Sequence, residues 1–418
     1  MKLFEAGSLW SFKGFRLFWF STTIFVLGAS AFPIALAVTV LDAGGTATSL
    51  GLILGARVLS GVLFAPFAGV WSDRLPRKQV MIVADLSRAA IVFAMVFVSA
   101  PQLPHFLLAL AVFLMGIGDA FGAASAGAIM PSLLPDDKLP AGNVARGVMV
   151  KSASIIGPGI GGVSVFLIGG RLTFLFTAVA FAFGTYFLAQ IKEDINAGKK
   201  AQEPFMVELR EGLRTVLDIP WIGAMIAMAS IQLMVVLAAE NVLLPVITRR
   251  EFGTNNAFAL SAAAFSFGGI ISAIISVKLK IKHQGQFSVL VWMLLVLAPL
   301  SLAFPVSESF VVIAYLLAGF SVGPWEAFWN SALQREVPRE LQGRVFSIDH
   351  MGSVGLMPLG MALVGPAVAF FGEKELLIGA SIFHFLVCAL VLLVPGVKDM
   401  KMPVDSSGRT ITGVKTRT

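Results

Sequence analysis

Long apolar runs, separated by short polar segments, make up most of this 418-residue chain. Twelve of the runs reach the roughly 20 residues that an α-helix needs to cross a bilayer. Lipid cannot hydrogen-bond the backbone, and the runs lack the alternation of barrel strands, so the pattern predicts an all-α membrane protein. The predicted spans are residues 15–41, 46–71, 79–100, 104–131, 144–169, 171–191, 218–248, 254–278, 286–305, 309–334, 344–371 and 374–397.

Most connections between the spans are short, and the exception divides the chain. Residues 192–217 are rich in charge and end in an amphipathic helical pattern. We interpret this segment as a cytoplasmic linker between an N-terminal six-helix bundle, residues 1–191, and a C-terminal one, residues 218–397. The remaining residues, 398–418, are expected to form a disordered cytoplasmic tail.

The two halves echo each other weakly in sequence. Residues 133–147 read LLPDDKLPAGNVARG, and residues 336–347 read EVPRELQGRVFS. Each places a proline, charged residues and a leucine before Asn or Gln and an arginine. Two six-helix halves related by an internal repeat are a known transporter architecture, so the echo favours two pseudo-symmetric bundles.

Composition supports a lipid environment and excludes several chemistries. Hydrophobic residues make up 57% of the chain and charged residues only 13%, with a mean hydropathy of +0.87. A soluble domain has about 25% charged residues. The one cysteine, Cys388, excludes an internal disulfide, and the four histidines are not clustered. We therefore expect no metal site.

The net charge of +7 is distributed as a topology signal. Lysine and arginine concentrate in alternate connections, and this bias predicts that both termini lie in the cytoplasm. The opposite connections hold only Arg171, Arg249, Arg250 and Lys374. The basic excess thus indicates a multi-pass protein of the cell inner membrane, with the lipid bilayer rather than nucleic acid as its partner.

The polar island GVWSDRLPRKQV, residues 69–80, lies between the second and third spans. Its aspartate can accept hydrogen bonds from free amides at the start of a neighbouring helix, where the dipole favours an anion. Asp85 and Arg88 follow, three residues apart and so on one helix face. Asp349, in the eleventh span, is a candidate partner from the other half.

This island resembles the signature loop of the major facilitator superfamily, G-x-x-x-D-R-x-G-R-[RK]. Pro76 stands where the superfamily usually has glycine. The continuation ADLSRA (84–89) and residues 333–366 are similar to the drug and siderophore exporter branch, which includes macrolide-efflux and enterobactin-exporter-like proteins. The residues that match the loop are Gly69, Asp73, Arg74, Arg77 and Lys78.

The resemblance implies the major facilitator fold and a cytoplasmic latch. In that latch the aspartate of the island caps the eleventh helix, which starts near Gly343, when the transport site faces outward. Asp85, Arg88 and Asp349 would extend the same charge network. A simpler reading is that the loop is basic only because it lies on the cytoplasmic side.

The fifth span contains the stretch SIIGPGIGG. Small residues let membrane helices approach closely, and neighbouring helices can satisfy carbonyls freed by a proline. The stretch resembles the G-P-x-x-G-G pattern of exporters in the superfamily, which implies a hinge between the halves of an antiporter; generic helix packing is the alternative. The matching residues are Gly157, Pro158, Gly161 and Gly162, and a complementary small face in the eighth span is formed by Gly268, Ser272 and Ser276.

Ionisable groups at membrane depth are costly, and each is a candidate functional group. Asp119 lies near the middle of the fourth span, where Gly116, Gly118 and Gly122 leave room for a ligand or a close helix. Burial favours the protonated form of a carboxylate, so Asp119 is a candidate for proton coupling or for recognising a cationic substrate. Pairing with Arg57, near the middle of the second span, is the alternative.

The tenth span holds a second candidate. Trp325 and Trp329 are four residues apart, as are Glu326 and Asn330, so an aromatic face adjoins a polar one. This mixture suits large amphipathic or cationic compounds, although an aromatic anchor with a structural hydrogen bond would give the same pattern. Glu240, in the outer third of the seventh span, is expected to line the outer vestibule.

These patterns predict a secondary transporter rather than an enzyme. A phosphate-binding loop is absent from the sequence, so a proton gradient rather than ATP or a cofactor is the expected energy source. The resemblance implies export of a small amphipathic drug or siderophore-like metabolite by proton antiport with alternating access, in a monomer. Many relatives have Gly-Asp where this chain has Ala29-Ser30, so another group must carry the proton. An importer or uniporter of the same fold, or a non-transporting sensor or scramblase, remains open.

Overall fold

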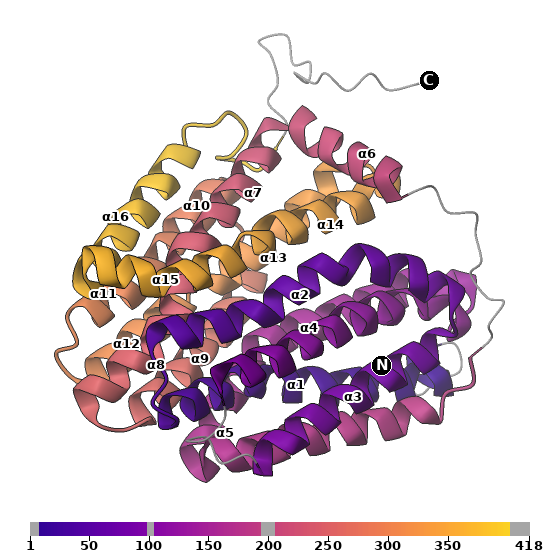
Figure 1. The fold of residues 1–418 in the computed structure, drawn as a ribbon. Helices are drawn as coiled ribbons and strands as arrows, with labels where there is room; N and C mark the ends of the chain where they lie inside the picture. The colour runs from indigo at the N-terminus through magenta and orange to yellow at the C-terminus, as the bar shows by residue number, and fades with distance from the viewer. Residues whose placement is uncertain (1–7, 98–103, 194–204, 402–418) are drawn as a thin grey trace, which may run out of the picture. The chain divides into compact units, whose positions relative to one another are not determined.

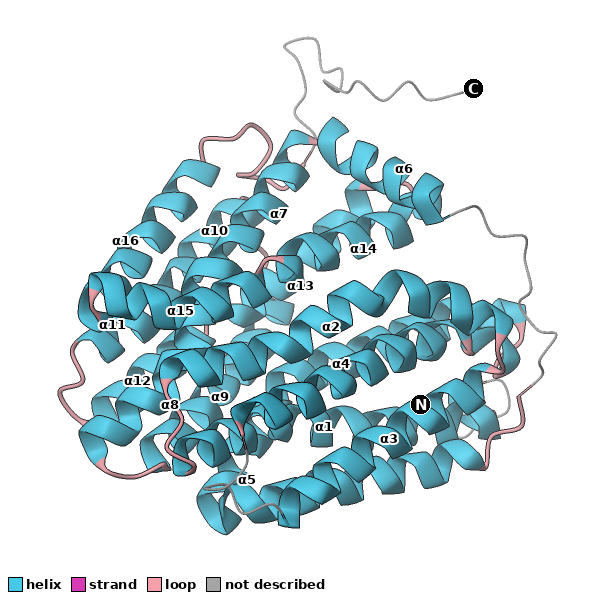
Figure 2. Ribbon diagram, in the orientation of Figure 1, coloured by secondary structure: helices cyan, strands magenta, loops and turns pink. Residues whose placement is uncertain are grey.

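The computed structural model describes residues 8–97, 104–193 and 205–401, and these ranges are almost entirely helical, with no strand among them (Figure 2). Eleven helices within the described ranges are long and apolar enough to cross a membrane. The predicted all-α membrane fold is therefore confirmed. The chain divides into two compact units, residues 1–201 and 202–418.

The first unit contains five long helices (Figure 1). They are α1 (Lys13–Asp42), α2 (Ala47–Arg74), α3 (Arg77–Phe97), α4 (His105–Ala128) and α5 (Leu139–Ala189). The start of α2 shows why the apolar run begins as a helix. Thr46 and Ser49 form a reciprocal capping box that satisfies two free amides ahead of the run.

Helix α5 accounts for two predicted spans. At about 1.5 Å per residue its 51 residues would extend roughly 75 Å, more than twice the thickness of the hydrocarbon core. Gly169 interrupts it with φ 76° and ψ 168°, a conformation that glycine adopts without steric cost. The break separates the fifth span from the sixth, so the unit has the six predicted spans.

The second unit is built from shorter helical pieces. They are α6 (Phe205–Asp218), α7 (Pro220–Gln232), α8 (Ala238–Phe252), α9 (Asn256–Lys278), α10 (Gln284–Trp292), α11 (Leu297–Ala303), α12 (Glu308–Gly319), α13 (Val322–Glu336), α14 (Arg339–Gly355), α15 (Met357–Phe371) and α16 (Glu373–Val391). The π-helical turn Leu233–Leu237 joins α7 to α8, which together form the seventh span. Likewise α10 with α11, α12 with α13, and α14 with α15 each form one span.

The predicted internal repeat is visible in the packing of each unit. In the first unit, α1 packs against α5 and α2 against α4. In the second, the seventh span packs against the eleventh through α8 and α15, and the eighth against the tenth through α9, α12 and α13. First-with-fifth and second-with-fourth pairing thus occurs in both units.

Glycines provide the close approaches at these equivalent pairs. A Cβ on Gly161 of α5 would lie 2.8 Å from the Ala31 Cα of α1, and a Cβ on Gly268 of α9 would collide with the Leu316 carbonyl of α12. Gly323 of α13 approaches α9 in the same way. Each small face thus contacts a helix of its own unit, and the predicted complementarity of the fifth and eighth spans stays a prediction.

The linker and the tail differ from their predicted limits. Residues 194–204 of the predicted linker lie outside the described residues, and its last part forms α6, which packs on α14 and α7 of the second unit. Gly212 of α6 lies against Arg344, which also forms an ion pair with Glu211. Residues 398–401, predicted as disordered tail, contact the start of α10, where the Gln286 amide donates to the Lys398 carbonyl at 2.9 Å.

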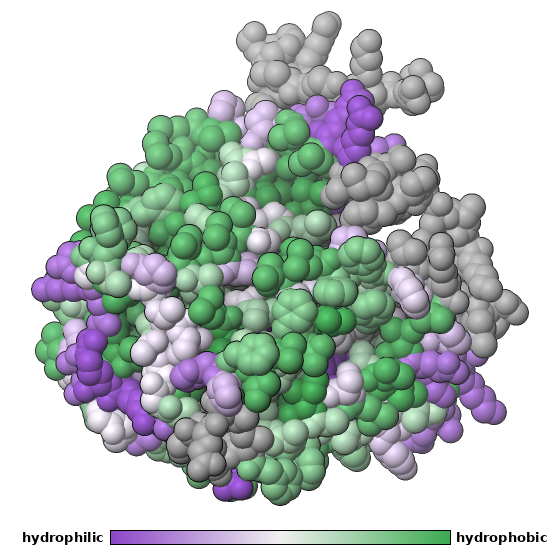
Figure 3. Space-filling view, in the orientation of Figure 1, coloured by the Kyte–Doolittle hydropathy of each residue, from purple (hydrophilic) through white to green (hydrophobic). Residues whose placement is uncertain are grey.

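Apolar side chains dominate the visible helix faces, while strongly polar residues gather over α6 and around helix ends (Figure 3). Phe106, Leu167 and Phe370 are 69%, 69% and 81% exposed. Large apolar side chains this exposed would be unfavourable in water, and they suit helices whose outer faces contact lipid.

The close contact between α5 and α1 predicts that a methyl group added at this contact lowers the stability, whereas one added at an open position does not. Gly161→Ala should lower the thermal stability of the purified protein in detergent, because a Cβ there meets the backbone of α1 and overpacking costs roughly 1–3 kcal/mol. Gly127→Ala, at an exposed α4 position with open space around it, is the matched control and should leave stability unchanged or slightly higher. Equal stability of the two variants would contradict the packing.

Candidate functional site

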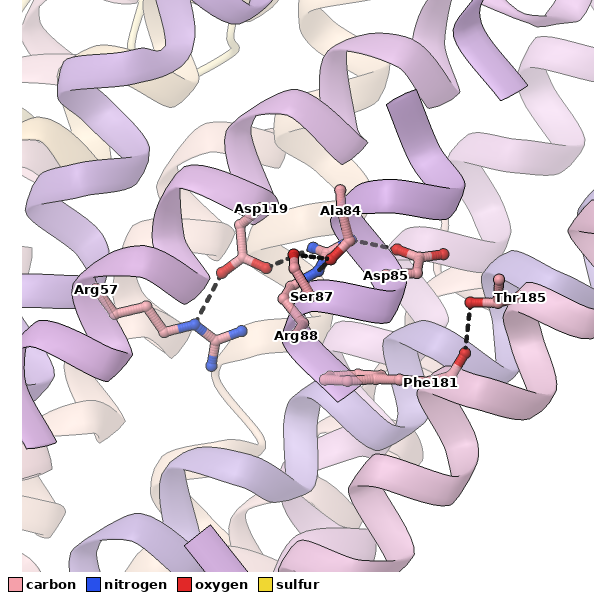
Figure 4. Close-up of polar contacts among 8 residues, drawn as sticks. All are labelled: Arg57, Ala84, Asp85, Ser87, Arg88, Asp119, Phe181 and Thr185. Atoms are coloured by element: carbon pink, nitrogen blue, oxygen red, sulfur yellow. Dashed lines mark hydrogen bonds and ion pairs between the residues drawn. The ribbon is translucent and has the colours of Figure 1, made fainter. Parts of the chain in front are cut away.

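A network of two aspartates and two arginines lies inside the first unit. Asp119 of α4 is held from two sides: Arg57 Nε of α2 donates to its Oδ2 at 2.8 Å, and Arg88 Nη1 of α3 donates to its Oδ1 at 2.7 Å. Figure 4 shows both guanidinium groups directed at this carboxylate. Arg88 also pairs with Asp85, one turn earlier on the same helix. The predicted shared face of Asp85 and Arg88 is confirmed.

The arginines of this network have aromatic as well as acidic neighbours. The Arg88 guanidinium lies 4.1 Å from the ring centroid of Phe25, and that of Arg57 lies 5.1 Å from Phe32. Both rings belong to α1. The Arg88 Nε donates to the Ala84 carbonyl at 3.1 Å. All three nitrogens of the buried Arg88 guanidinium therefore donate to acceptors, which is what a charge in a low-dielectric interior requires.

The glycines around Asp119 explain why α4 accommodates this network. A Cβ on Gly118 would lie 3.3 Å from the Arg88 side chain, and one on Gly122 would lie 2.8 Å from its Nη2. A Cβ on Gly116 would collide with the backbone of Arg57 in α2. The predicted room for a ligand or a close helix is thus occupied by the Arg88 side chain and by α2.

The four charges of the network balance. The side chains of Arg57 and Asp119 are 16% and 31% exposed, and those of Arg88 and Asp85 are 2% and 6% exposed. The Arg57–Asp119 pair, which the sequence offers as an alternative to a proton or substrate site, is present. Because each Asp119 oxygen accepts from a guanidinium group, the geometry favours the ionised carboxylate.

The polar island caps helices inside the first unit. The backbone amides of Arg77 and Lys78, at the start of α3, donate to the two carboxylate oxygens of Glu193 at 3.0 and 2.9 Å. The Lys78 Nζ donates to the carbonyls of Ala189 and Ile191 at 2.7 Å, at the end of α5. An acid at a helix start and a base at a helix end both complement the dipole. The sequence reasoning did not include Glu193.

The latch itself stays a prediction. The side chains of Asp73 and Arg74 lie outside the described residues, and Gly69 is half-buried near the end of α2. Asp349 accepts a hydrogen bond from Trp329 Nε1 at 3.0 Å within its own unit.

The G-P-x-x-G-G stretch lies at the contact between α5 and α1. Gly157, Gly161 and Gly162 are buried, and Pro158 is half-buried. A Cβ on Gly157 would collide with the side chain of Ser30 of α1. The motif's glycines thus bring α5 directly onto that part of α1.

The second unit contains a stack of tryptophans. Ring centroids are 5.1 Å apart for Trp292 and Trp325, 6.1 Å for Trp325 and Trp329, and 5.8 Å for Trp329 and Trp221. Trp325 and Trp329 are only 9% and 4% exposed. The aromatic face is therefore buried in this structure, and its predicted role in meeting a substrate stays a prediction.

A buried polar cluster ends this stack. Trp292 Nε1 donates to Gln232 Oε1 at 2.8 Å, and Gln232 Nε2 donates to Cys388 Sγ at 3.2 Å. His384 Nε2 lies 3.0 Å from the Trp292 carbonyl oxygen. These residues come from three spans, so no local motif brings them together in the sequence.

The two membrane-depth glutamates of the second unit have different surroundings. Glu326 is half-buried, and its Oε2 accepts from Asn330 Nδ2 at 2.9 Å, as the four-residue spacing predicts. Glu240 is 7% exposed, and its Oε1 has no hydrogen-bond partner among the described residues. Glu240 is thus a buried carboxyl group at membrane depth, and its predicted place at the outer vestibule stays a prediction.

A cavity of about 550 Å³ lies along α3 and α4 of the first unit. Its lining is mostly apolar and includes Val83, Ile91, Leu114 and Phe121. The four charges of the network do not line it, so this cavity and the network are separate features.

Comparison with known proteins places this geometry in context. The family model described as the Major Facilitator Superfamily matches residues 18–360. The chain is 27% identical to the multidrug efflux pump Tap of Mycobacterium tuberculosis over 398 residues, 92% of each chain. It is 22% identical to macrolide efflux protein A of Streptococcus pyogenes over 398 residues, which are 93% of this chain and 96% of the relative. The crystal structure of the nucleoside transporter NupG matches with a TM-score of 0.66 at 12% identity, covering 90% of this chain and 98% of that one.

The charge balance of the network predicts that one substitution lowers the stability and that a second, compensating substitution partly restores it. Asp119→Asn should lower the stability in detergent by about 3 kcal/mol, the lower end for breaking a buried pair, because Asp119 is 31% exposed. The double variant Asp119→Asn/Arg57→Gln restores neutrality and should regain part of the loss in the same thermal unfolding assay. An additive loss in the double variant would contradict the coupling of these charges.

Proposed function

The chain belongs to the Major Facilitator Superfamily, and on that premise we propose that it exports small amphipathic drugs by proton antiport. It is a membrane transporter rather than an enzyme, as its family and its similarity to efflux pumps show. The observation that carries the proposal is the similarity to two named drug exporters over more than nine-tenths of the chain.

The two exporters also support a choice between the predicted cargo classes. Both are named for drug efflux, one of them for macrolides. Glu326 supports a cationic cargo, because it is a half-buried carboxylate at membrane depth whose Oε2 accepts from the Asn330 side-chain amide. Asp119 is less suited to that role, since two arginines already hold it. We therefore favour amphipathic drugs with a basic amine over siderophore-like metabolites.

The proposed cycle is alternating access between two six-span units. The loop from Gly69 to Lys78 would act as the cytoplasmic latch in the outward-facing state, with Asp73 capping the eleventh span. The contact of Gly157 and Gly161 with α1 would allow α5 to shift without breaking polar contacts, since small apolar surfaces can slide. A proton gradient supplies the energy in place of a cofactor.

The charge distribution of the loops supports an orientation. Both termini are proposed to lie in the cytoplasm, with the chain in the cell inner membrane and acting as a monomer. The end of α8 and the start of α16 then face outward, where Arg250 forms a bidentate ion pair with Glu373 at 2.7 and 3.1 Å.

The proposal predicts proton-driven accumulation of drug in inverted membrane vesicles. Vesicles containing the protein should accumulate radiolabelled erythromycin, a macrolide with a basic amine, when their interior is acidified, and a protonophore should abolish the accumulation. Vesicles from cells without the protein are the control. Accumulation that ignores the imposed gradient would contradict antiport, and accumulation only in the reverse direction would indicate an importer.

The proposed role of Glu326 predicts a change in substrate selectivity. Glu326→Gln should reduce transport of cationic erythromycin about tenfold, equivalent to ~1.4 kcal/mol, while transport of neutral chloramphenicol changes little. The contrast between the two drugs separates lost recognition from lost folding. Equal loss for both drugs would show that Glu326 does not select the cation.

A further inference from the structure

We propose that Glu240 is the proton-binding site of the second unit, with the Tyr315 hydroxyl as its hydrogen-bond donor when the proton leaves. This inference rests on the proposed antiport and names the group that takes up and releases the proton. The sequence predicted that Glu240 lies at membrane depth, and its side chain is buried in the structure.

The first observation is a buried carboxyl group without a counter-charge. Glu240 is 7% exposed, its Oε1 lacks a hydrogen-bond partner, and no ion pair to it occurs among the described residues. An unpaired carboxylate in a low-dielectric interior costs several kcal/mol, whereas a protonated carboxyl group does not carry that cost. In this conformation the neutral acid is therefore the favoured form.

The helices around Glu240 offer no base to neutralise it. The elements packed against α8 are α9, α11, α15 and the turn Leu233–Leu237. Among them only α9 contains a charged or titratable residue, Lys278, at its far end. Lys278 is the last residue of α9, and its side chain is exposed.

A buried hydroxyl of the same unit belongs to Tyr315 of α12. Tyr315 is 4% exposed, and its hydroxyl has no hydrogen-bond partner among the described residues. We assign this hydroxyl as the donor to the Glu240 carboxylate when the surrounding helices move. A neutral hydroxyl can donate to a carboxylate when the proton leaves, and it adds no charge of its own.

The second observation is that Glu240 lies in a weakened part of its helix. The π-helical turn Leu233–Leu237 ends three residues before it, and Pro245 follows five residues after it. Proline has no amide to donate to the carbonyl one turn earlier, and π-helical turns frequently mark functional sites. Glu240 therefore lies where the seventh span bends at low cost, so protonation and helix movement can be coupled.

The position along the span also suits a proton carrier. Glu240 is 20 residues from Pro220 and 12 from Phe252, or about 30 Å and 18 Å along the helix. It is therefore reached from an aqueous surface only when the surrounding helices part. Asp119 and Glu326 differ, because each already accepts hydrogen bonds from a described partner.

The proposed step needs only water and the proton gradient. When the site opens toward the side of higher proton concentration, the Glu240 carboxylate takes a proton from water and forms an O–H bond. Closure then buries the neutral acid. When the site opens to the other side, the O–H bond breaks, the proton returns to water, and Tyr315 donates a hydrogen bond to the carboxylate.

The test compares driven transport with exchange in proteoliposomes containing the purified full chain. Uptake of radiolabelled erythromycin is measured in two ways. Driven uptake is measured into proteoliposomes whose interior is acidic. Counterflow is measured without a proton gradient, as the exchange of external labelled drug for internal unlabelled drug. Glu240→Gln has the shape of the neutral acid. Its rate of driven uptake should be at least tenfold lower than that of the unmodified protein, while its counterflow is retained. Glu308→Gln, in the first turn of α12, is the matched control and should retain both.

Each outcome decides between the two proposals. If the unmodified protein shows counterflow but no driven uptake, the proposed antiport fails. If driven uptake occurs and Glu240→Gln retains it, the proton-site assignment is overturned. If Glu240→Gln keeps driven uptake but binds erythromycin more weakly, Glu240 acts in substrate binding instead, and the proton-site assignment is overturned as well.

Tyr315→Phe covers the case in which Glu240→Gln loses both activities. The hydroxyl lacks a partner, so its removal should leave the fold intact. Without a donor for the carboxylate, the pH dependence of driven uptake should shift to higher pH while counterflow persists. An unshifted pH profile would overturn the assignment.

Discussion

A charge inside a helix bundle surrounded by lipid must be paired with an opposite charge or be neutralised by a proton. In the first unit the buried charges are paired. Asp119 lies between Arg57 and Arg88, Arg88 also pairs with Asp85, and the four charges cancel. The buried carboxyl group of Glu240, in the second unit, has no such partner among the described residues. This difference separates a fixed, structural network from a group that can exchange a proton.

Glycine placement makes both arrangements possible. Gly116, Gly118 and Gly122 bring α2 and the Arg88 side chain against α4, so the ion pairs form at hydrogen-bond distance. In the second unit, glycines of α9 and α13 close the contact between the eighth and tenth spans. The same pairs of spans pack closely in both units. Close helix contacts thus recur in the repeat, while the buried charges differ from one unit to the other.

The sequence predicted the fold well because long apolar runs and basic loops are direct consequences of the bilayer. The twelve spans, the division into two units and the Arg57–Asp119 pair follow from such patterns. The additional pairing of Arg88 with Asp119 was missed, because residues 31 positions apart on different helices carry no local spacing signal. For Trp325 and Trp329 the sequence left a substrate face and an aromatic anchor open, since helical spacing shows that two rings share a face but not what covers it. Glu240 was placed by its depth along the span alone, because the sequence does not show which side chains surround it.

The central claim is that one buried carboxyl group, Glu240, carries the exchangeable proton. Difference infrared spectroscopy of the purified protein tests it directly, because a protonated carboxylic acid has a carbonyl stretching band that shifts in heavy water. Raising the pH through the working range should remove this band from the unmodified protein, and Glu240→Gln should lack it from the outset while Asp119→Asn retains it. A titrating band of full intensity in Glu240→Gln would contradict the account.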